Sequence, residues 1–325
     1  MEKPVRIYIL GSGAMGGLYG GFLSQNPANR VTLICRRLQT AQAINRAGLS
    51  LITPQGELTF SNLRAVTGPE EGERADLLIV LVKAYDTFEA IKAAAGLVTA
   101  GTAVVSLQNG LGHQELLGQI VGHDRVISGV STFGAIAEGP GRVILRGYGE
   151  TVIGESDGSV SDRVLGMAQL FRQSSLGGKV TTDITAAVWG KLAVNAGINA
   201  LAAILRSPNG VIMEHPETAA IMEEAVREVV AVGFKAGVNL ENDDVLESVA
   251  EVCRNTSQNI CSTLQDILRG RPTEIDTING AVVKLGLELG VPTPVNRLLA
   301  RLVMVQERLH RPKDGPGKGG LGVDL

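Results

Sequence analysis

Short apolar runs alternate with helical stretches in the first part of the chain. The runs Val5–Leu10 and Arg30–Cys35 are rich in β-branched residues and flank a helical stretch, Met15–Ser24. Asp76–Val82 is apolar after its first residue, as expected for a strand buried on both faces of a parallel sheet. This alternation predicts βαβ units. The other elements predicted here are strands at Leu49–Ile52, Leu58–Phe60, Ala103–Leu107, Arg125–Ser128, Val143–Leu145 and Thr151–Ile153, helices at Thr87–Leu97, His113–Ile120 and Asp162–Ser174, and a loop at Gly129–Ala135.

The pattern changes near residue 182, where helical periodicity replaces the strands. The helices predicted beyond it are Ile184–Leu205, Pro216–Ala236, Asp243–Asn255, Pro272–Leu289 and Pro294–Leu309. Proline begins three of them, a favoured place for that residue. We therefore expect an α/β plus all-α chain: a Rossmann-like domain over 1–182 and a helical domain over 183–310. The stretch 311–325 lacks periodicity and aromatic residues, and we expect a flexible tail.

One predicted helix combines apolar sides with an unusual polar stripe. Trp189–Leu205 consists largely of Ala, Val, Ile and Leu, but it carries Lys191, Asn195 and Asn199. At about 100° per residue, these positions lie along one face. A helix that is apolar all round is normally buried, and a buried Lys or Asn needs a partner. The stripe therefore indicates a functional site, although a surface helix with a thin polar stripe remains an alternative.

A glycine-rich motif follows the first predicted strand directly. Gly11-Ser12-Gly13-Ala14-Met15-Gly16 fits G-x-G-x-x-G, and a helix and a second strand come next at βαβ spacing. In that context the glycines permit a tight turn, close approach of a pyrophosphate, and packing of the helix on the strand. The motif predicts dinucleotide binding. A glycine-rich turn is the alternative, since the chain contains 41 glycines.

The ends of the predicted strands offer further candidate ligands. Arg36 and Arg37 follow the second strand, where an acidic residue would favour NAD, and the two cations favour the 2′-phosphate of NADPH. Lys83 and Asn109 follow the next two buried strands, at the edge where open α/β sheets bind ligands. The alternatives are a solvated arginine pair, a surface lysine and an Asn-Gly turn.

Composition excludes several other classes of protein. The 325 residues carry 30 Lys and Arg against 33 Asp and Glu, for a net charge of −3, which disfavours a nucleic-acid partner. The longest aliphatic run, Leu77–Val82, is far shorter than the ~20 residues of a membrane span, and Gly11 interrupts the N-terminal apolar run too early for a signal peptide. The three cysteines show no C-x-x-C spacing, so we expect a reduced, cytoplasmic protein without a metal site.

Taken together, these motifs resemble those of the ketopantoate reductase family, over nearly the whole length to about residue 310. The motifs that carry the resemblance are Gly11–Gly16, Lys83-Ala84-Tyr85-Asp86-Thr87, Gln108-Asn109-Gly110, the helix with Trp189, Lys191, Asn195 and Asn199, Pro208-Asn209-Gly210, Ser262-x-Leu264-Gln265-Asp266, and Thr273-Glu274-Ile275-Asp276-x-x-Asn279-Gly280. Two positions depart from the family pattern. Phe133 stands where histidine is frequent, and Cys261-Ser262-Thr263 replaces a more usual Ser-Ser-Met.

The resemblance implies a role for each matching residue. Lys191 matches the family's proton donor, and Glu274 could orient its ammonium group. The positions that match substrate contacts are Asn109, Lys191, Asn195, Asn199, Asn209 and Ser262. The positions that match cofactor contacts are Gly11, Ser12, Gly13, Ala14, Met15, Gly16, Arg36, Lys83, Asn109, Ala135 and Glu274.

The function so implied is the NADPH-dependent reduction of 2-dehydropantoate, a small 2-oxo acid, to (R)-pantoate. Three alternatives stay open: a related reductase of another 2-oxo acid or of a 3-hydroxy acid, a non-catalytic NADPH-binding sensor, and a structural interaction protein. We expect no nucleic-acid, membrane or metal partner. The sequence does not give the oligomeric state, and a homodimer is one assembly that it leaves open.

Overall fold

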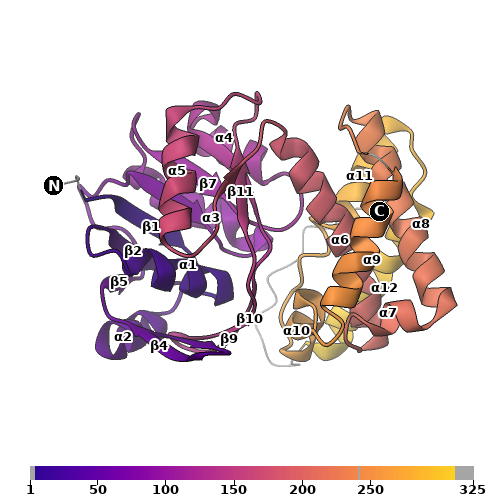
Figure 1. The fold of residues 1–325 in the computed structure, drawn as a ribbon, viewed down its shortest axis with the longest axis horizontal. Helices are drawn as coiled ribbons and strands as arrows, with labels where there is room; N and C mark the ends of the chain where they lie inside the picture. The colour runs from indigo at the N-terminus through magenta and orange to yellow at the C-terminus, as the bar shows by residue number, and fades with distance from the viewer. Residues whose placement is uncertain (1–3, 241, 312–325) are drawn as a thin grey trace. The chain divides into compact units, whose positions relative to one another are not determined.

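The chain folds into two compact units. A computed structural model describes residues 4–240 and 242–311 (Figure 1). One unit comprises residues up to 108 together with 112–184, and the other comprises 109–111 together with residues from 185 onward. The predicted domain boundary after residue 182 lies close to this division, whereas nothing in the sequence pattern pointed to the placement of 109–111. Residues 312–325, which make up most of the predicted tail, lie outside the described residues.

The first unit is built on a main sheet with strand order β12-β11-β8-β7-β6-β1-β2-β5. Neighbouring strands are parallel except β8 and β11, which pair antiparallel. This arrangement confirms the predicted Rossmann-like sheet. The strands are β1 Arg6–Leu10, β2 Arg30–Ile34, β5 Leu63–Val66, β6 Leu77–Val80, β7 Ala103–Ser106, β8 Val126–Ser131, β11 Thr151–Gly154 and β12 Lys179–Val180.

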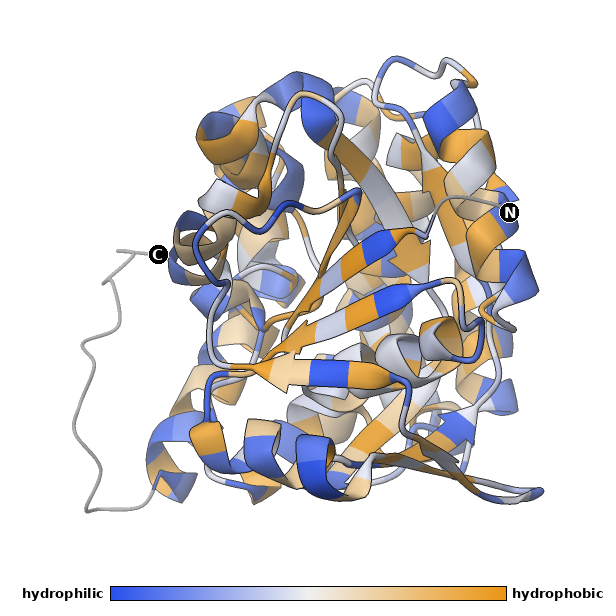
Figure 2. Cartoon of the chain, turned by 90° about the vertical axis from the view of Figure 1, so that its left-hand side faces the viewer, coloured by the Kyte–Doolittle hydropathy of each residue, from blue (hydrophilic) through white to orange (hydrophobic). Residues whose placement is uncertain are grey.

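Alternate side chains of the central strands enter two separate cores. Ile7 and Ile9 of β1 pack with residues of α1 and α5, whereas Tyr8 and Leu10 pack with residues of α3 and α4. This follows from the two-residue period of a strand, and because both faces are covered, β1 reads as a continuous apolar run. Figure 2 shows hydrophobic residues along these strands and hydrophilic residues on the surrounding helices. The helices are α1 Ala14–Ser24, α2 Leu38–Ala47, α3 Thr87–Ala94, α4 His113–Val121 and α5 Asp162–Gln173.

A second sheet, with strand order β4-β3-β10-β9, packs on α1. Its strands are β3 Leu49–Thr53, β4 Gly56–Phe60, β9 Gly134–Gly139 and β10 Arg142–Gly147. The predicted loop at Gly129–Ala135 was wrong, because β8 continues to Ser131 and β9 begins at Gly134. Glycine and serine weaken the local strand pattern there, but hydrogen-bonded neighbours on both sides hold β8 extended. Helix α2 and strand β5 were not predicted.

The second unit contains helices and no strand in its described residues, as predicted. Its helices are α6 Ile184–Leu205, α7 Val211–Glu214, α8 Pro216–Lys235, α9 Asn242–Asn255, α10 Ser262–Leu268, α11 Asn279–Leu289 and α12 Pro294–His310. The short helices α7 and α10 were not predicted. The predicted helix Pro272–Leu289 was wrong in its first part, since α11 begins at Asn279. Local hydrogen bonds fold the preceding segment into turns, with the Glu274 carbonyl accepting from the backbone N–H of Thr277 and of Ile278.

Helix α6 also bears on the expectation that the chain has no membrane partner. Over the described residues it is the one helix long and apolar enough to cross a membrane, and 56% of its most apolar window is buried. The core helix of a globular protein passes the same test. Many of its residues, including Leu192, Ala196 and Ala203, belong to the core of the second unit.

Candidate active site

The glycine motif forms a tight turn between β1 and α1. Gly11 has a φ of +105° and donates its N–H to the carbonyl of Ile34 at 3.0 Å. A Cβ atom on Gly16 would lie 1.8 Å from the Gly11 carbonyl oxygen, so only glycine allows α1 to start this close to the strand. A Cβ atom on Gly13 would meet no atom within 4 Å. The first and third glycines therefore shape the turn, and the second leaves open space in front of it.

The first backbone N–H groups of α1 follow directly after Gly13. Gly13 is the N-cap residue of α1, and among the described residues no side chain caps it. The first N–H groups of a helix lack partners within the helix, and together with the helix dipole they form a favourable site for an anion. The turn is therefore suited to hold the phosphates of a dinucleotide.

The predicted 2′-phosphate ligand, Arg36, follows β2 and engages in an ion pair. Its Nη1 atom lies 2.9 Å from Oδ2 of Asp86, and its side chain is 70% exposed. Asp86 belongs to a short turn that begins after Lys83, whose carbonyl accepts the Asp86 N–H at 2.8 Å. Asp86 belongs to the motif Lys83–Thr87, and the family resemblance implies no role for it. No motif spacing reveals this pair, because its two members lie 50 residues apart.

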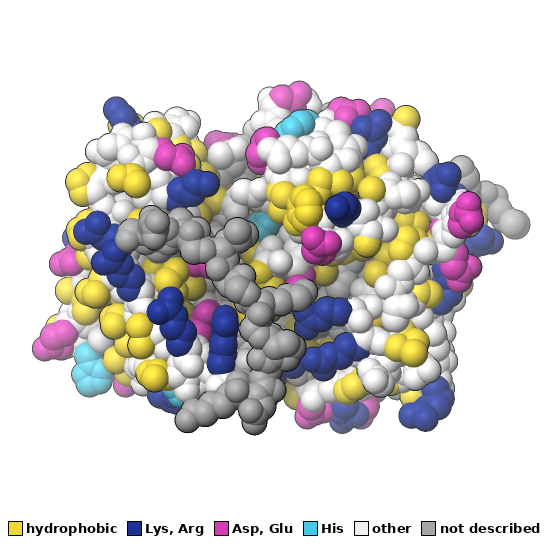
Figure 3. Space-filling model, turned by 180° about the vertical axis from the view of Figure 1, so that it is seen from behind, with side chains coloured by type: hydrophobic (Ala, Val, Ile, Leu, Met, Phe, Trp, Pro, Cys, Tyr) yellow, Lys and Arg dark blue, Asp and Glu magenta, His cyan; other side chains and the backbone are white. Residues whose placement is uncertain are grey.

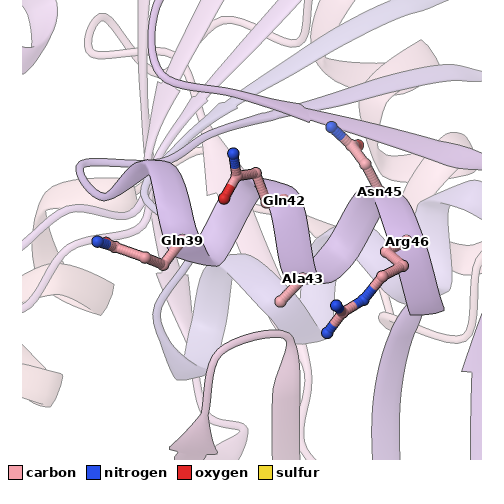
Figure 4. A pocket seen from close by; sticks show the side chains of 5 residues that line it. All are labelled: Gln39, Gln42, Ala43, Asn45 and Arg46. Atoms are coloured by element: carbon pink, nitrogen blue, oxygen red, sulfur yellow. The ribbon is translucent and has the colours of Figure 1, made fainter.

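Two other predicted cofactor contacts, Lys83 and Ala135, have different surroundings. Lys83 is partly exposed, in the segment that follows β6. Ala135 lies on β9 of the second sheet opposite Leu145, and it packs against the core that contains α1. A surface hollow on α2 is lined by Gln39, Gln42, Ala43, Asn45 and Arg46 (Figure 4). None of the predicted site residues belongs to it, so it is not the candidate site.

In the second unit, Lys191 of α6 is paired electrostatically with Glu274. Burial lowers the pKa of the lysine to about 8, and the negative charge of Glu274 opposes this shift. Glu274 is only 7% exposed. A buried ammonium group is costly without a partner, and the carboxylate reduces that cost. The pair thus supplies a cation whose proton is held less tightly than that of an ordinary lysine.

Three amide side chains form a line that leads to Glu274. Asn199 donates to Oδ1 of Asn195 at 3.3 Å, Asn195 donates to Oδ1 of Asn109 at 3.5 Å, and Asn109 donates to Oε2 of Glu274 at 3.4 Å. These distances are at the long end of the hydrogen-bond range. The amides are therefore aligned but weakly bound to one another, which suits groups that a polar ligand engages.

Asn109 joins this line because residues 109–111 belong to the helical unit. Leu111 donates its N–H to the carbonyl of Thr277 at 3.0 Å, and a Cβ atom on Gly110 would lie 2.3 Å from that same oxygen. Gly110, with a φ of +90°, is thus required for the close approach to Thr277. The structure brings together four predicted residues from three distant segments: Asn109, Asn195, Asn199 and Glu274.

Asn209 lies between α6 and α7, and Ser262 is the first residue of α10. The amide nitrogen of Asn209 donates to Thr256 at 2.9 Å, and its Oδ1 atom is buried without a hydrogen-bond partner in the described part of the chain. Ser262 begins α10 directly after Cys261, whose Sγ atom donates to the carbonyl of Asn199 at 3.4 Å. Neither residue has a described hydrogen bond to the amide line, so their predicted role in binding substrate stays a prediction.

Comparisons with known proteins identify the family of this chain. Residues 7–158 match the family described as ketopantoate reductase PanE/ApbA, and residues 183–307 match the family of its C-terminal domain. The chain belongs to the ketopantoate reductase family. Among its relatives, a 2-dehydropantoate 2-reductase of Halobacterium salinarum is 35% identical over 94% of this chain and 99% of its own length. A 2-dehydropantoate 2-reductase of Pyrococcus horikoshii is also 35% identical, over 94% of this chain and 98% of its own length.

Solved structures of ketopantoate reductases and related dehydrogenases share the fold. A ketopantoate reductase of Ralstonia eutropha is 32% identical, with a TM-score of 0.86 over 94% of this chain and 99% of its own. A D-mandelate dehydrogenase in a ternary structure with NADH and anilino(oxo)acetate is 27% identical, with a TM-score of 0.89 over the same shares. These likenesses cover both units.

The two departures from the family pattern have local structural roles. Phe133 is buried and meets Tyr19 of α1 edge to face, with ring centroids 6.4 Å apart. Cys261 caps α10 by accepting the N–H of Leu264 on its Sγ atom, a task for which serine is usual. Burial raises the pKa of this thiol to about 11, so it stays neutral. Both substitutions are accommodated by packing and capping.

Proposed function

We propose that this chain reduces 2-dehydropantoate to (R)-pantoate, with NADPH as the hydride source and Lys191 as the proton donor. The observation that carries the proposal is the pairing of Lys191 with Glu274 beside a line of three amides. The names of the relatives from Halobacterium salinarum and Pyrococcus horikoshii support the same substrate.

The chemistry of carbonyl reduction explains the need for these groups. Bound NADPH would supply the hydride, and negative charge would then develop on the carbonyl oxygen of the substrate. The ammonium of Lys191 can stabilise that charge and transfer a proton from Nζ to the oxygen. Glu274 keeps the ammonium charged and oriented despite its burial. The amides of Asn109, Asn195 and Asn199 both donate and accept hydrogen bonds, which suits a substrate bearing a hydroxyl group.

The cofactor-side residues of the first unit fit a dinucleotide phosphate. The open space at Gly13 and the N–H groups at the start of α1 would hold the pyrophosphate, and Arg36 would hold the 2′-phosphate of NADPH. Lys83, Ala135, Asn109 and Glu274 remain proposed cofactor contacts on the strength of the family resemblance. We also propose a cytoplasmic location, because the three cysteines show no C-x-x-C spacing and are free.

A turnover assay tests the proposal directly. NADPH oxidation should depend on added 2-dehydropantoate, and the product should be (R)-pantoate by chiral analysis. Arg36→Ala should raise the KM for NADPH far more than the KM for NADH. The rise should correspond to a loss of binding free energy on the order of 2 kcal/mol, as for one lost charge-assisted contact. Tight NADPH binding without turnover of any 2-oxo acid would instead identify a sensor.

The likeness to D-mandelate dehydrogenase favours a second candidate, the reduction of a different 2-oxo acid. That protein was solved with NADH and an aromatic oxo acid analogue, and it covers 94% of this chain. A panel of aliphatic and aromatic 2-oxo acids, each assayed with NADPH and with NADH, separates the two candidates by their kcat/KM values. A higher value for an aromatic 2-oxo acid than for 2-dehydropantoate would replace the first proposal with the second.

A further inference from the structure

The ion pair between Arg36 and Asp86 stands at the point where the two cofactors differ. We propose that Asp86 influences the cofactor selectivity, because its carboxylate competes for Arg36 and repels the 2′-phosphate. It thereby reduces the ratio by which this chain binds NADPH more tightly than NADH. This inference rests on the proposed function, because it assumes that a dinucleotide binds at the glycine motif and reaches Arg36.

The carboxylate of Asp86 is held more firmly than the arginine it contacts. Its backbone N–H donates to the Lys83 carbonyl, and the next residue, Thr87, is fully buried. Gln108 anchors this turn by donating to the hydroxyl of Thr87 at 2.7 Å and to the carbonyl of Val82 at 2.8 Å. Arg36, by contrast, has a side chain that is 70% exposed, while that of Asp86 is 37% exposed. The backbone that carries the carboxylate is therefore anchored, and the more exposed guanidinium group is the less restrained member of the pair.

The two cofactors place different groups beside this pair. The 2′-phosphate of NADPH has to draw Arg36 away from Asp86 and then lies close to a second negative charge, which repels it. The ribose 2′-hydroxyl of NADH is uncharged and can donate a hydrogen bond to a carboxylate. Asp86 therefore disfavours NADPH and tolerates or assists NADH. The exposed ion pair itself adds little to the stability of the fold, so the carboxylate can be changed without unfolding the unit.

Binding measurements on variants of the full chain test this inference. The Kd values for NADPH and NADH would be measured by fluorescence titration for the wild type, Asp86→Asn, Arg36→Ala and the double variant. Asp86→Asn should lower the Kd for NADPH about threefold to tenfold and leave the Kd for NADH unchanged or higher. The gain for NADPH should be smaller in the Arg36→Ala background, because one part of the effect is competition for the guanidinium group.

A matched control separates this local effect from a change in net charge. Glu57 pairs with Arg142 at 2.8 Å, with side chains 47% and 45% exposed, in the same unit but on the second sheet. Glu57→Gln alters the net charge as Asp86→Asn does and should leave both Kd values unchanged. If Asp86→Asn leaves the ratio of the two Kd values as it was, or if Glu57→Gln shifts it equally, the inference is overturned although the proposed function stands. If neither dinucleotide binds any form of the chain, both fail.

Discussion

At the scale of single residues, Lys191 carries the charge that the proposed reaction requires. In the proposed reaction it would act only as the hydride arrives, so its contribution would belong to the transition state rather than to binding. Lys191→Ala should therefore lower kcat by a factor on the order of 10² to 10⁴ while NADPH binds with nearly normal affinity. Steady-state kinetics together with a fluorescence titration of NADPH would measure both quantities. Near-wild-type kcat in this variant would remove the lysine from the mechanism.

Glu274 should act together with Lys191, because its negative charge opposes the lowering of the lysine pKa by burial. If they form a unit, the double variant Lys191→Ala, Glu274→Ala should lose clearly less transition-state stabilisation than the two single variants added together. The values of kcat/KM for the four forms of the chain give the coupling. Additive losses would show that Glu274 serves substrate or cofactor independently.

The lowered pKa of Lys191 also predicts a pH dependence of the rate. The group must be protonated to donate, and its pKa is about 8 rather than 10.5. The rate of reduction should therefore be high below that pKa and fall as pH rises through it. Glu274→Gln removes the charge that raises the pKa of the lysine, so the fall should begin at lower pH in this variant. A pH profile of kcat/KM measures both midpoints, and an unmoved midpoint in Glu274→Gln would argue against the pairing.

The line of amides predicts a separation of substrate binding from cofactor binding. Asn195→Ala and Asn199→Ala should raise the KM for the 2-oxo acid and leave the Kd for NADPH near normal, because a site that hydrogen-bonds a hydroxyl leaves partners unpaired when an amide is truncated. The contrary outcome is that the variants lose folded protein, as measured by circular dichroism, while the folded fraction keeps the kinetics of the wild type. The polar stripe of α6 would then serve the core alone.

At the scale of elements, α1 owes its position to a row of glycines. Cβ atoms added to Gly17, Gly20 and Gly21 would lie 2.6 to 2.8 Å from side-chain atoms of Val143, Leu33 and Phe60, which belong to strands of both sheets. The helix therefore packs closer to the two sheets than a helix with larger side chains could. This packing also determines where the N–H groups at its start point.

A pair of glycine-to-alanine changes tests this packing. Gly17→Ala places a methyl group against Val143, and the overpacking should destabilise the chain by about 1–3 kcal/mol despite the better helix propensity of alanine. Gly166 in α5 is exposed and would meet nothing within 4 Å, so Gly166→Ala should stabilise by about 0.5–1 kcal/mol. Urea denaturation of both variants measures the difference. Equal changes in stability for the two variants would show that the packing of α1 accommodates the added methyl group.

A buried polar network holds α6 against its neighbours in the second unit. Asn279 of α11 donates to the Ala196 carbonyl of α6 at 3.1 Å and to Asn296 of α12 at 2.9 Å. Asn296 in turn donates to Glu228 of α8 at 2.7 Å. These residues link four helices, and they fix the position of α6 relative to the segment that carries Glu274. The network thereby supports the pairing of Lys191 with Glu274.

At the scale of the whole molecule, the first unit has two apolar cores and the second unit has one of its own, and each unit carries part of the candidate residues. Basic and acidic side chains both appear on the face shown in Figure 3, as expected for a net charge of −3. The glycine motif and Arg36 belong to the first unit, and Lys191, Glu274 and the amide line belong to the second. Substitutions of Arg36 should therefore act mainly on cofactor affinity and substitutions of Lys191 mainly on proton transfer. Asn109 and Glu274 are also proposed cofactor contacts, so their substitution should affect both.

Thermal unfolding with and without NADPH would test whether Arg36 and Lys191 differ in their contribution to cofactor binding. A ligand that binds only the folded state stabilises it by about 2.7 kcal/mol at a hundred times its Kd, so NADPH should raise the Tm of the wild type. Lys191→Ala should keep this rise, whereas Arg36→Ala should lose much of it at the same NADPH concentration. A lost rise in Lys191→Ala would mean that the lysine contributes to cofactor binding.

Local pattern alone determined the fold class and the approximate bounds of many elements. The aliphatic runs of β1, β2, β6 and β7 are buried on both faces, and α6 was predicted with the bounds that the structure gives it. These predictions succeeded because burial demands apolar residues at a fixed period, which a sequence displays directly. Where capping or turn hydrogen bonds decide, as at α10 and before α11, the period is absent and the prediction missed or misplaced the element.

The sequence by itself also determined which residue types are candidates, because a glycine motif after a strand and a lysine on an apolar helix are local features. Only the tertiary structure decided which of them meet. The alignment of Asn109 with Asn195, the approach of Glu274 to that line, and the pairing of Arg36 with Asp86 join segments that are 50 to 165 residues apart. Such contacts depend on how elements pack in space, and no spacing along the chain encodes that packing.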